Sequence, residues 1–224
     1  MKNLVLKSFL SASLIALSFG VNAAGDVSNG EKIAAAECAA CHGADGNSTT
    51  PMFPKLAGLG EKYLLKQLYD IQNANGKKPK NPSRAIAEMT GLLDAKSDQE
   101  LADIAAYYAA QPIQLSGAKE IQVQVNSGSK VDGLKLGARV YRSGNLENGV
   151  PACTGCHSPR GMGNAPAGYP RLSGQHADYI AKQLRDFRAG NRTNDGATSE
   201  MREVAKKMSD AEITAVSNFI SGLN

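Results

Sequence analysis

Two copies of one short motif use all 4 cysteines of this 224-residue chain. The motif, Cys-x-x-Cys-His, occupies residues 38–42 and again residues 153–157. This spacing is typical of covalent haem attachment, in which two thiols add to the porphyrin vinyl groups and the histidine binds the iron. The sequence therefore predicts two covalently bound haem c groups. The residues concerned are Cys38, Cys41 and His42 for the first haem and Cys153, Cys156 and His157 for the second.

Cysteine pairs with this spacing also occur in zinc sites and in thioredoxin-like redox centres. Neither alternative explains a histidine directly after both pairs, and neither pair lies in β-rich sequence. Haem attachment is therefore the interpretation that accounts for the whole motif.

Residues 1–23 have the pattern of a secretory signal peptide. Two lysines give a positive start, residues 9–21 are mostly apolar, and small residues end the stretch at Ala23. The alternative is a retained membrane anchor, but serines, a glycine and an asparagine interrupt a stretch that would need about 20 predominantly apolar residues. We expect cleavage after Ala23 and a mature protein in the periplasm.

The rest of the chain consists of two similar halves. Pro54-Lys55-Leu56-Ala57-Gly58 matches Pro170-Arg171-Leu172-Ser173-Gly174, and Tyr-x-x-x-Gln-Leu follows at the same distance in both halves. Repetition on this scale indicates two copies of one domain. The stretch between the copies has little helical periodicity, which is typical of an extended connector. The expected boundaries are 24–112 for the first domain, 113–132 for the connector and 133–224 for the second domain.

Both halves have the pattern of an all-α fold, since neither contains a long alternation of apolar and polar residues. Three Ser-x-x-Glu sequences, starting at Ser28, Ser97 and Ser209, predict capping boxes that open helices. Aromatic residues make up only 5% of the chain, so we expect a haem to complete each core. The final helix of each half has an apolar stripe, formed by Leu101, Ile104, Ala105 and Tyr108 and by Ile213, Val216 and Ile220.

Each iron needs a second axial ligand, and five methionines follow the predicted signal peptide. Met89 and Met201 occupy matching places in the repeat, whereas Met52 and Met162 do not. We therefore predict Met89 as the second ligand of the first iron and Met201 as that of the second iron. Met208 is then expected to fill the core. A thioether favours ferrous iron and occupies the position that a small substrate would need.

The loops after the haem motifs contain Pro54 and Pro170, which lie 12 and 13 residues after the histidines. Their carbonyls are candidate acceptors for the second ring nitrogen of each histidine, although both residues could equally be ordinary loop prolines. The third histidine, His176, has Gly60 at its place in the repeat. We expect its side chain to be solvated rather than a metal ligand.

With the duplicated haem motif and the paired methionines, the chain resembles the cytochrome c4 family, the periplasmic dihaem members of the class I cytochromes c. The resemblance covers residues 24–224 and implies two tandem class I cytochrome c domains related by a pseudo-twofold axis, with haem propionates near their interface. It also implies the ligand pairs His42 with Met89 and His157 with Met201, and the carbonyls of Pro54 and Pro170 as acceptors. The longer segment from Gly137 to Cys153 leaves the first helix of the second domain open.

Proteins of this family carry electrons, so the resemblance implies an electron-transfer protein and not an enzyme. Its implied partners in a bacterial respiratory chain are a quinol-oxidising cytochrome complex (quinol-cytochrome c reductase) as donor and a haem-copper terminal oxidase as acceptor. We expect a monomer that binds no nucleic acid, with peripheral membrane association left open. One alternative is a dihaem electron-transfer subunit of a flavoprotein or other dehydrogenase complex. Another is a dihaem peroxidase, which would need an iron without a firm methionine ligand.

The two halves differ in charge. Residues 24–112 contain 9 Lys and Arg against 11 Asp and Glu (−2), and residues 113–224 contain 14 against 10 (+4). Lys182, Arg185 and Arg188 lie at helical spacing, with Arg192 just beyond. One hypothesis is a basic surface on which an acidic partner docks. The alternative is a solvated face, or pairing of some of these side chains with haem propionates.

Overall fold

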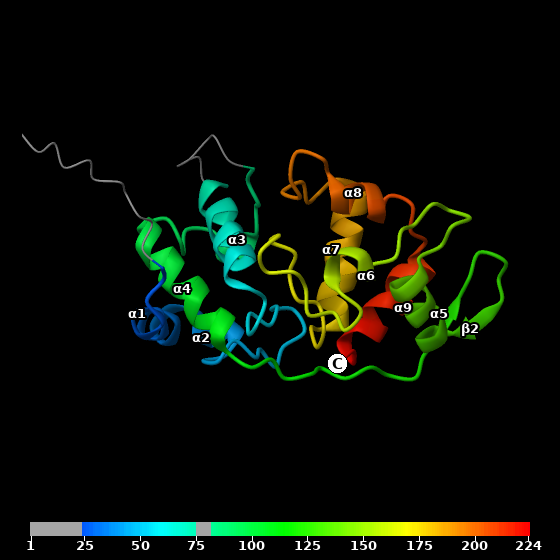
Figure 1. Ribbon diagram of the computed structural model, residues 1–224, viewed down its shortest axis with the longest axis horizontal. Helices are drawn as coiled ribbons and strands as arrows, with labels where there is room; N and C mark the ends of the chain where they lie inside the picture. Colours follow the sequence, from blue (N-terminus) through cyan, green and yellow to red (C-terminus); the bar gives the residue numbers. More distant parts are fainter. Residues whose placement is uncertain (1–23, 75–81) are drawn as a thin grey trace, which may run out of the picture.

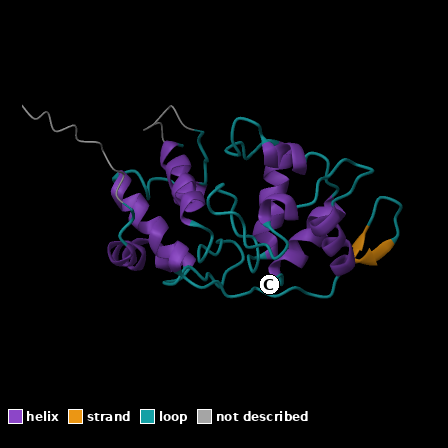
Figure 2. Cartoon of the chain, viewed as in Figure 1, coloured by secondary structure: helices purple, strands orange, loops and turns teal. Residues whose placement is uncertain are grey.

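The structure is a computed structural model that describes residues 24–74 and 82–224. The predicted signal peptide lies outside the described residues. Two helical bodies lie side by side along the long axis, and one segment of chain joins them along the lower edge (Figure 1). Helices dominate both bodies, and a single hairpin supplies the strands of the described chain (Figure 2).

In the first domain, the first helix, α1, crosses the last helix, α4. Helix α3 also packs on α4. A π-helical turn, η1, lets the chain run from α1 into the haem motif without a break. The elements in order are α1 (Val27–Ile33), η1 (Ala34–Cys38), α2 (Ala39–His42), α3 (Glu61–Asn73), the 3-10 turn η2 (Ala87–Met89) and α4 (Asp98–Ala110).

The second domain repeats this arrangement, with α5 crossing α9 and α7 packing on α9. Its first helix, which the sequence left open, ends at Ser143 and is followed by Gly144 at φ 69°. Residues 145–150 then form a turn closed by two Asn145–Val150 backbone hydrogen bonds of 2.8 Å, before the haem motif begins. The elements are α5 (Gly133–Ser143), α6 (Thr154–His157), α7 (Ala177–Ala189), α8 (Glu200–Ala205) and α9 (Asp210–Ser221).

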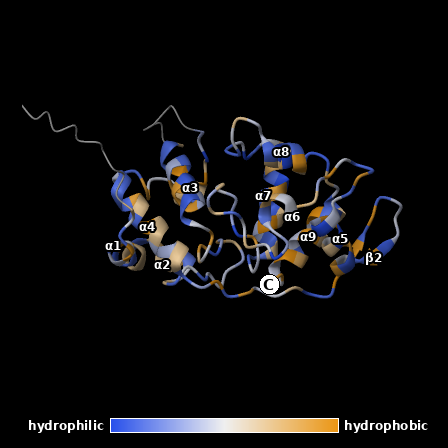
Figure 3. Ribbon diagram, viewed as in Figure 1, coloured by the Kyte–Doolittle hydropathy of each residue, from blue (hydrophilic) through white to orange (hydrophobic). Residues whose placement is uncertain are grey.

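The larger helices are two-sided, with hydrophobic residues beside hydrophilic ones (Figure 3). Every residue of the stripes predicted on α4 and α9 is at most 2% exposed. Apolar area removed from water is the main stabilising contribution to such a core. Among the described residues, no helix is long and apolar enough to cross a membrane.

Glycine permits both helix crossings. A Cβ atom on Gly30 would lie 2.0 Å from the carbonyl oxygen of Asp103, and one on Gly137 would lie 2.2 Å from that of Ala215. Both distances are far below van der Waals contact. The two helices of each pair can therefore approach this closely only where one of them lacks a side chain.

Two of the three predicted capping boxes are present, at Ser97 and Ser209. The prediction at Ser28 is wrong, because Asp26 caps α1. Its carboxylate accepts from the backbone N–H of Ser28 at 2.8 Å and of Asn29 at 3.2 Å. The backbone N–H of Asp26 itself donates to the Asp103 carboxylate at 2.7 Å, so contact with α4 fixes where α1 begins.

One buried tyrosine stands beside the first haem-motif cysteine of each domain, but it comes from different helices. Tyr108 is on α4, and its repeat position on α9 is Ile220. Tyr141 is on α5, and its repeat position in the first domain is Ala34. The first domain therefore combines Ala34 with Tyr108, and the second combines Tyr141 with Ile220.

The connector is tied to both domains. The Asn47 side chain donates to the carbonyl of Pro112 at 2.9 Å and accepts from the N–H of Gln114 at 2.7 Å. The Asn218 side chain bonds both the N–H and the carbonyl of Lys119, at 3.0 and 2.8 Å. The connector ends in an antiparallel hairpin that the sequence did not predict, because its strands are only three residues long. These strands are β1 (Gln122–Gln124) and β2 (Lys130–Asp132).

We predict that Gly137→Ala lowers the free energy of unfolding by about 1–3 kcal/mol, since the added methyl group forces α5 away from α9. Denaturant unfolding of the holoprotein measures this. Gly155→Ala is the matched control, because a Cβ there has no atom within 4 Å and Ala40 holds its place in the first motif. Equal stability of the two variants would contradict the role given to Gly137.

Candidate functional site

A cavity of about 690 Å³ lies in the first domain and opens toward the second. Cys38, Cys41 and His42 line it, and so does Met89 on η2. The rest of its lining is largely aliphatic, which suits a flat apolar ring. The aliphatic residues are Leu56, Leu59, Leu64, Leu68, Ile71, Ile86, Leu92, Leu93 and Ile104.

Both haem-motif histidines are buried and held in the same way. The Nδ1 atom of His42 lies 2.9 Å from the carbonyl oxygen of Pro54, and that of His157 lies 2.9 Å from the carbonyl oxygen of Pro170. Because the carbonyl can only accept, Nδ1 must donate, and Nε2 is left with its lone pair. Burial lowers the pKa of both imidazoles, although the hydrogen bond to proline opposes it. Both rings are therefore neutral and suited to bind a metal through Nε2.

The four thiols are free, with no disulfide within either pair. The first cysteine of each pair is partly buried and the second is exposed. Burial is the main cause that raises the pKa of Cys38 and Cys153, so neither thiol is a ready nucleophile or thiolate ligand. An aliphatic cavity, a neutral buried imidazole and two free thiols beside it fit a covalently attached haem.

The methionines differ in their surroundings. Met52 also lines the cavity, but it belongs to the loop of Pro54 and is 70% exposed. Met162 is 48% exposed. Met208 is buried in the second core, and Met201 packs half-buried against the edge of that core.

A network of polar side chains joins the domains where the first cavity opens. Arg84 donates to Gln67 of its own domain at 2.8 Å. It also crosses the interface, donating to the Tyr179 hydroxyl at 3.1 Å and to Gln183 at 2.9 Å. All four residues line the cavity.

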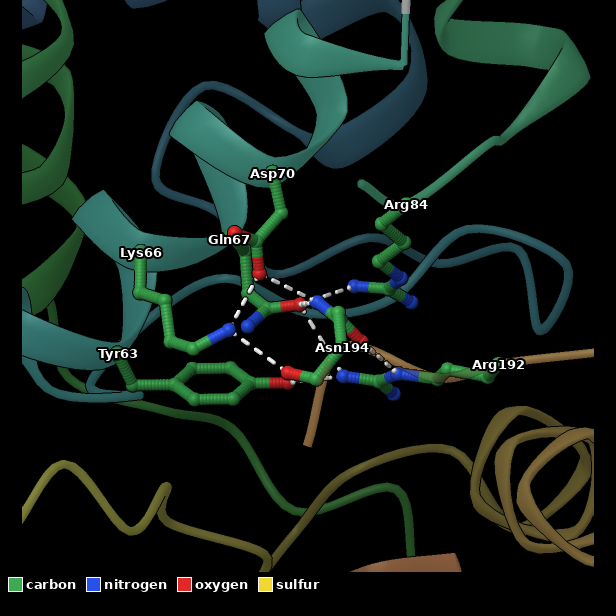
Figure 4. A network of polar contacts seen from close by, with 7 residues as sticks. All are labelled: Tyr63, Lys66, Gln67, Asp70, Arg84, Arg192 and Asn194. Carbon is green, nitrogen blue, oxygen red and sulfur yellow. Dashed lines mark hydrogen bonds and ion pairs between the residues drawn. The ribbon is translucent and has the colours of Figure 1, made fainter. Parts of the chain in front are cut away.

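Arg192 makes the same set of bonds from the other side. It donates to Gln183 of its own domain at 2.8 Å, and across the interface to the Tyr63 hydroxyl at 3.2 Å and to Gln67 at 3.1 Å (Figure 4). Tyr63 with Tyr179, and Gln67 with Gln183, are matched pairs in the repeat. The interface is therefore reciprocal, as a pseudo-twofold axis requires.

The network contains more cations than anions. Asp70 accepts from Asn194 at 2.7 Å and pairs with Lys66, so Arg84, Arg192 and Lys66 face one carboxylate (Figure 4). Both guanidinium groups are buried. Buried charge needs counter-charge. The carboxylates of haem propionates would supply it at the mouth of this cavity.

Sequence reasoning missed the roles of the two arginines. Arg84 lies 5 residues before Met89, whereas Arg192 lies 9 residues before Met201, so the repeat did not align them. The matched tyrosines and glutamines were a usable signal, since polar residues repeated on a helix face are candidates for a shared contact.

The basic surface proposed on α7 is paired within the chain. Lys182 forms an ion pair with Asp186, and Arg188 with Asp210 at 2.6 Å. Arg185 lies 3.8 Å from the same Asp210. Lys182, Arg185 and Arg188 thus face carboxylates of the same chain, a pairing that the sequence analysis did not predict. Since Arg192 belongs to the interface, the structure does not favour a free basic docking surface.

The expectation that His176 is solvated is wrong. The side chain is buried between the domains, with Nε2 2.8 Å from the carbonyl oxygen of Ser48 and Nδ1 3.0 Å from the hydroxyl of Ser116. These partners come from the first domain and the connector, so domain docking removed the side chain from water.

Comparison with known proteins places these features in a family. The family described as cytochrome c matches residues 27–110 and 134–224. The chain is 53% identical to cytochrome c4 of Azotobacter vinelandii over 206 residues, covering 91% of each chain. The crystal structure of reduced recombinant cytochrome c4 from Pseudomonas stutzeri is similar with a TM-score of 0.80 and 51% identity, covering 90% of this chain and all of that one. A thiosulfate dehydrogenase electron acceptor from Stutzerimonas stutzeri is 34% identical over 87% of this chain and 82% of its own length.

We predict that Arg192→Lys weakens domain docking by about 1–3 kcal/mol. The reason is that one ammonium group cannot donate to all the acceptors that the planar guanidinium group of Arg192 reaches. Calorimetry of the holoprotein should then show a separate, earlier transition for the less stable domain. The control is Arg142→Lys, whose guanidinium only stacks 5.4 Å from the Phe219 ring. A single unchanged transition for Arg192→Lys would refute the role of this arginine.

Proposed function

This chain belongs to the cytochrome c family, and from that premise we propose that it carries electrons in the bacterial periplasm, from a quinol-oxidising cytochrome complex toward a haem-copper terminal oxidase. Its likeness to cytochrome c4 proteins over about nine-tenths of its length makes it a dihaem electron carrier and not an enzyme. The two Cys-x-x-Cys-His motifs fit two covalently bound haem c groups.

The main support for a carrier is that each half offers a histidine and a methionine as candidate axial ligands. We assign His42 and Met89 to the first iron and His157 and Met201 to the second. Both histidines are oriented by a proline carbonyl at 2.9 Å. Met89 lines the cavity of His42 from a separate segment, whereas Met52 lies on the loop that holds that histidine. A ligand from the opposite side of the ring must come from elsewhere than this loop.

A haem bound in this way supplies a reversible one-electron couple at its iron. The chain keeps water and small ligands away from that iron with aliphatic side chains and a methionine. Arg84 and Arg192, which belong to one network at the mouth of the first cavity, would bind the carboxylates of the haem propionates. The two sites therefore meet at a shared polar interface, which suits passage of an electron between domains.

Exposed apolar side chains beside the first cavity suit contact with partner proteins. Met52 is 70% exposed and Leu92 is 52% exposed, and both line the cavity. Residues of this kind at a rim lose water on docking and bring a partner close to the cofactor without permanent binding. A brief, weak complex is what a carrier requires.

A second candidate function is acceptance of electrons from a periplasmic dehydrogenase. It is favoured by the relative named thiosulfate dehydrogenase electron acceptor. The same haem sites would serve, and only the donor would differ.

The donor can be identified by rapid mixing. We predict that bacterial membranes containing the quinol-oxidising complex, supplied with quinol, reduce both haems of the purified protein, and that oxidase-containing membranes reoxidise them. Visible absorption follows both reactions. Slow reduction by the quinol system, with fast reduction by thiosulfate dehydrogenase and thiosulfate, would replace the first proposal by the second.

The axial ligands can be tested by substitution. We predict that Met89→Ala and Met201→Ala each remove half of the weak near-infrared sulfur-to-iron absorption of the oxidised protein and lower one reduction potential. Each variant should also bind carbon monoxide in the ferrous state, and we expect no such binding by the unmodified protein. Met208→Leu is the control and should change none of these. Loss of the band in that variant, with Met201→Ala unchanged, would move the ligand to Met208.

A further inference from the structure

A side chain of the second domain forms two hydrogen bonds with the backbone of the first domain. The Gln175 side chain accepts from the backbone N–H of Lys55 at 2.9 Å and donates to the carbonyl of the same residue at 2.8 Å. Gln175 is 3% exposed and Lys55 is 5% exposed. A buried amide bonded at both ends has no freedom to rotate without losing a hydrogen bond.

One of these two hydrogen bonds is made to the Pro54–Lys55 peptide, which orients the first haem-motif histidine. The carbonyl of Pro54, which accepts from His42 Nδ1, and the N–H of Lys55 belong to a single planar peptide unit. Holding the N–H in position therefore also holds the carbonyl. The chain of bonds runs from Gln175 Oε1 through this peptide to the imidazole, and each hydrogen bond in such a chain polarises the next.

Two further contacts join the same loop to the second domain and the connector, without bonding the Pro54–Lys55 peptide itself. His176 reaches the Ser48 carbonyl in the same loop at 2.8 Å. The ammonium group of Lys55 donates to the carbonyl of Gln114 in the connector. The loop after the first haem motif is thus clamped between the second domain and the connector.

In the described part of the chain, the second haem site lacks an equivalent of Gln175. The repeat position of Gln175 is Leu59, a buried residue of the first core that can neither donate nor accept from its side chain. Within residues 24–74 and 82–224, no hydrogen bond joins the first domain to the Pro170–Arg171 peptide. The first domain does reach the loop after the second haem motif, where the Lys62 ammonium group donates to the carbonyl of Pro166 at 2.8 Å. The described contact to a histidine-orienting proline peptide is therefore particular to the first site.

We propose that Gln175 is a positioning residue for the first haem: it orients and polarises the Pro54 carbonyl across the interface, so that domain docking adjusts the first iron and not the second. A stronger acceptor at Nδ1 makes the imidazole a stronger donor to iron, which stabilises the ferric state. This inference rests on the proposed ligand role of His42.

The test substitutes Gln175 in the holoprotein with Leu, the residue at its repeat position. If Gln175 polarises the Pro54 carbonyl, this substitution raises the reduction potential of one haem and leaves the reduction potential of the other haem constant. A redox titration followed by visible absorption measures both potentials. The ligand variants at Met89 and Met201 assign each potential to its haem. Nuclear magnetic resonance should show the His42 Nδ1 proton exchanging faster with solvent, and that of His157 unchanged.

His176→Gln is the matched control, because it removes contacts across the same interface without touching the Pro54–Lys55 peptide. It should leave both potentials in place. Equal shifts in the two variants, or no shift with Gln175→Leu, would overturn the proposal. If Gln175→Leu gives no holoprotein, Gln175→Met preserves length without the amide and must show the same shift. A His42 proton without a paramagnetic shift in the unmodified protein would instead refute its ligand role.

Discussion

The hydrogen bond from a buried imidazole to a proline carbonyl is the constraint on which each half of this protein depends. It commits Nδ1 to the protein and leaves Nε2 free to bind a metal, which we propose is the haem iron. Because a peptide unit is planar, a contact that fixes the N–H after the proline also fixes the orientation of the proline carbonyl. In the first half Gln175 of the other domain holds that N–H, so the surroundings of one cofactor depend on docking of the whole second domain.

The interface between the domains is polar where the cofactors would meet. Arg84 and Arg192 each bond one glutamine of their own domain and a tyrosine and a glutamine of the other. Such buried guanidinium groups require acceptors, and the side chains that accept from them in the described chain are neutral amide and hydroxyl groups. Docking and cofactor binding are therefore coupled, since the carboxylates of two haems would complete the network that joins the domains.

Much of the fold could be predicted because its signals are local or repeated. The buried stripes on α4 and α9 follow from helical periodicity, and the capping boxes at Ser97 and Ser209 from a four-residue pattern. The two wrong predictions, the helix cap at Ser28 and the solvated His176, share one cause. Asp26 is the cap because its backbone bonds to α4, and His176 is buried because its side chain contacts Ser48 of the other domain. In both cases a contact with a residue far away in the sequence determined the structure, and the local sequence pattern did not contain that contact.

The sequence by itself determined the chemistry of attachment and the duplication. Cysteines at i and i+3 with a histidine at i+4 meet on one helical turn whatever the rest of the chain does, and two similar sequences fold alike. Only the tertiary structure decided which residues join the two sites. Gln175 reaches Lys55 across 120 positions and Arg192 reaches Gln67 across 125. No periodicity extends that far, because these contacts depend on how the surfaces of two folded domains fit each other.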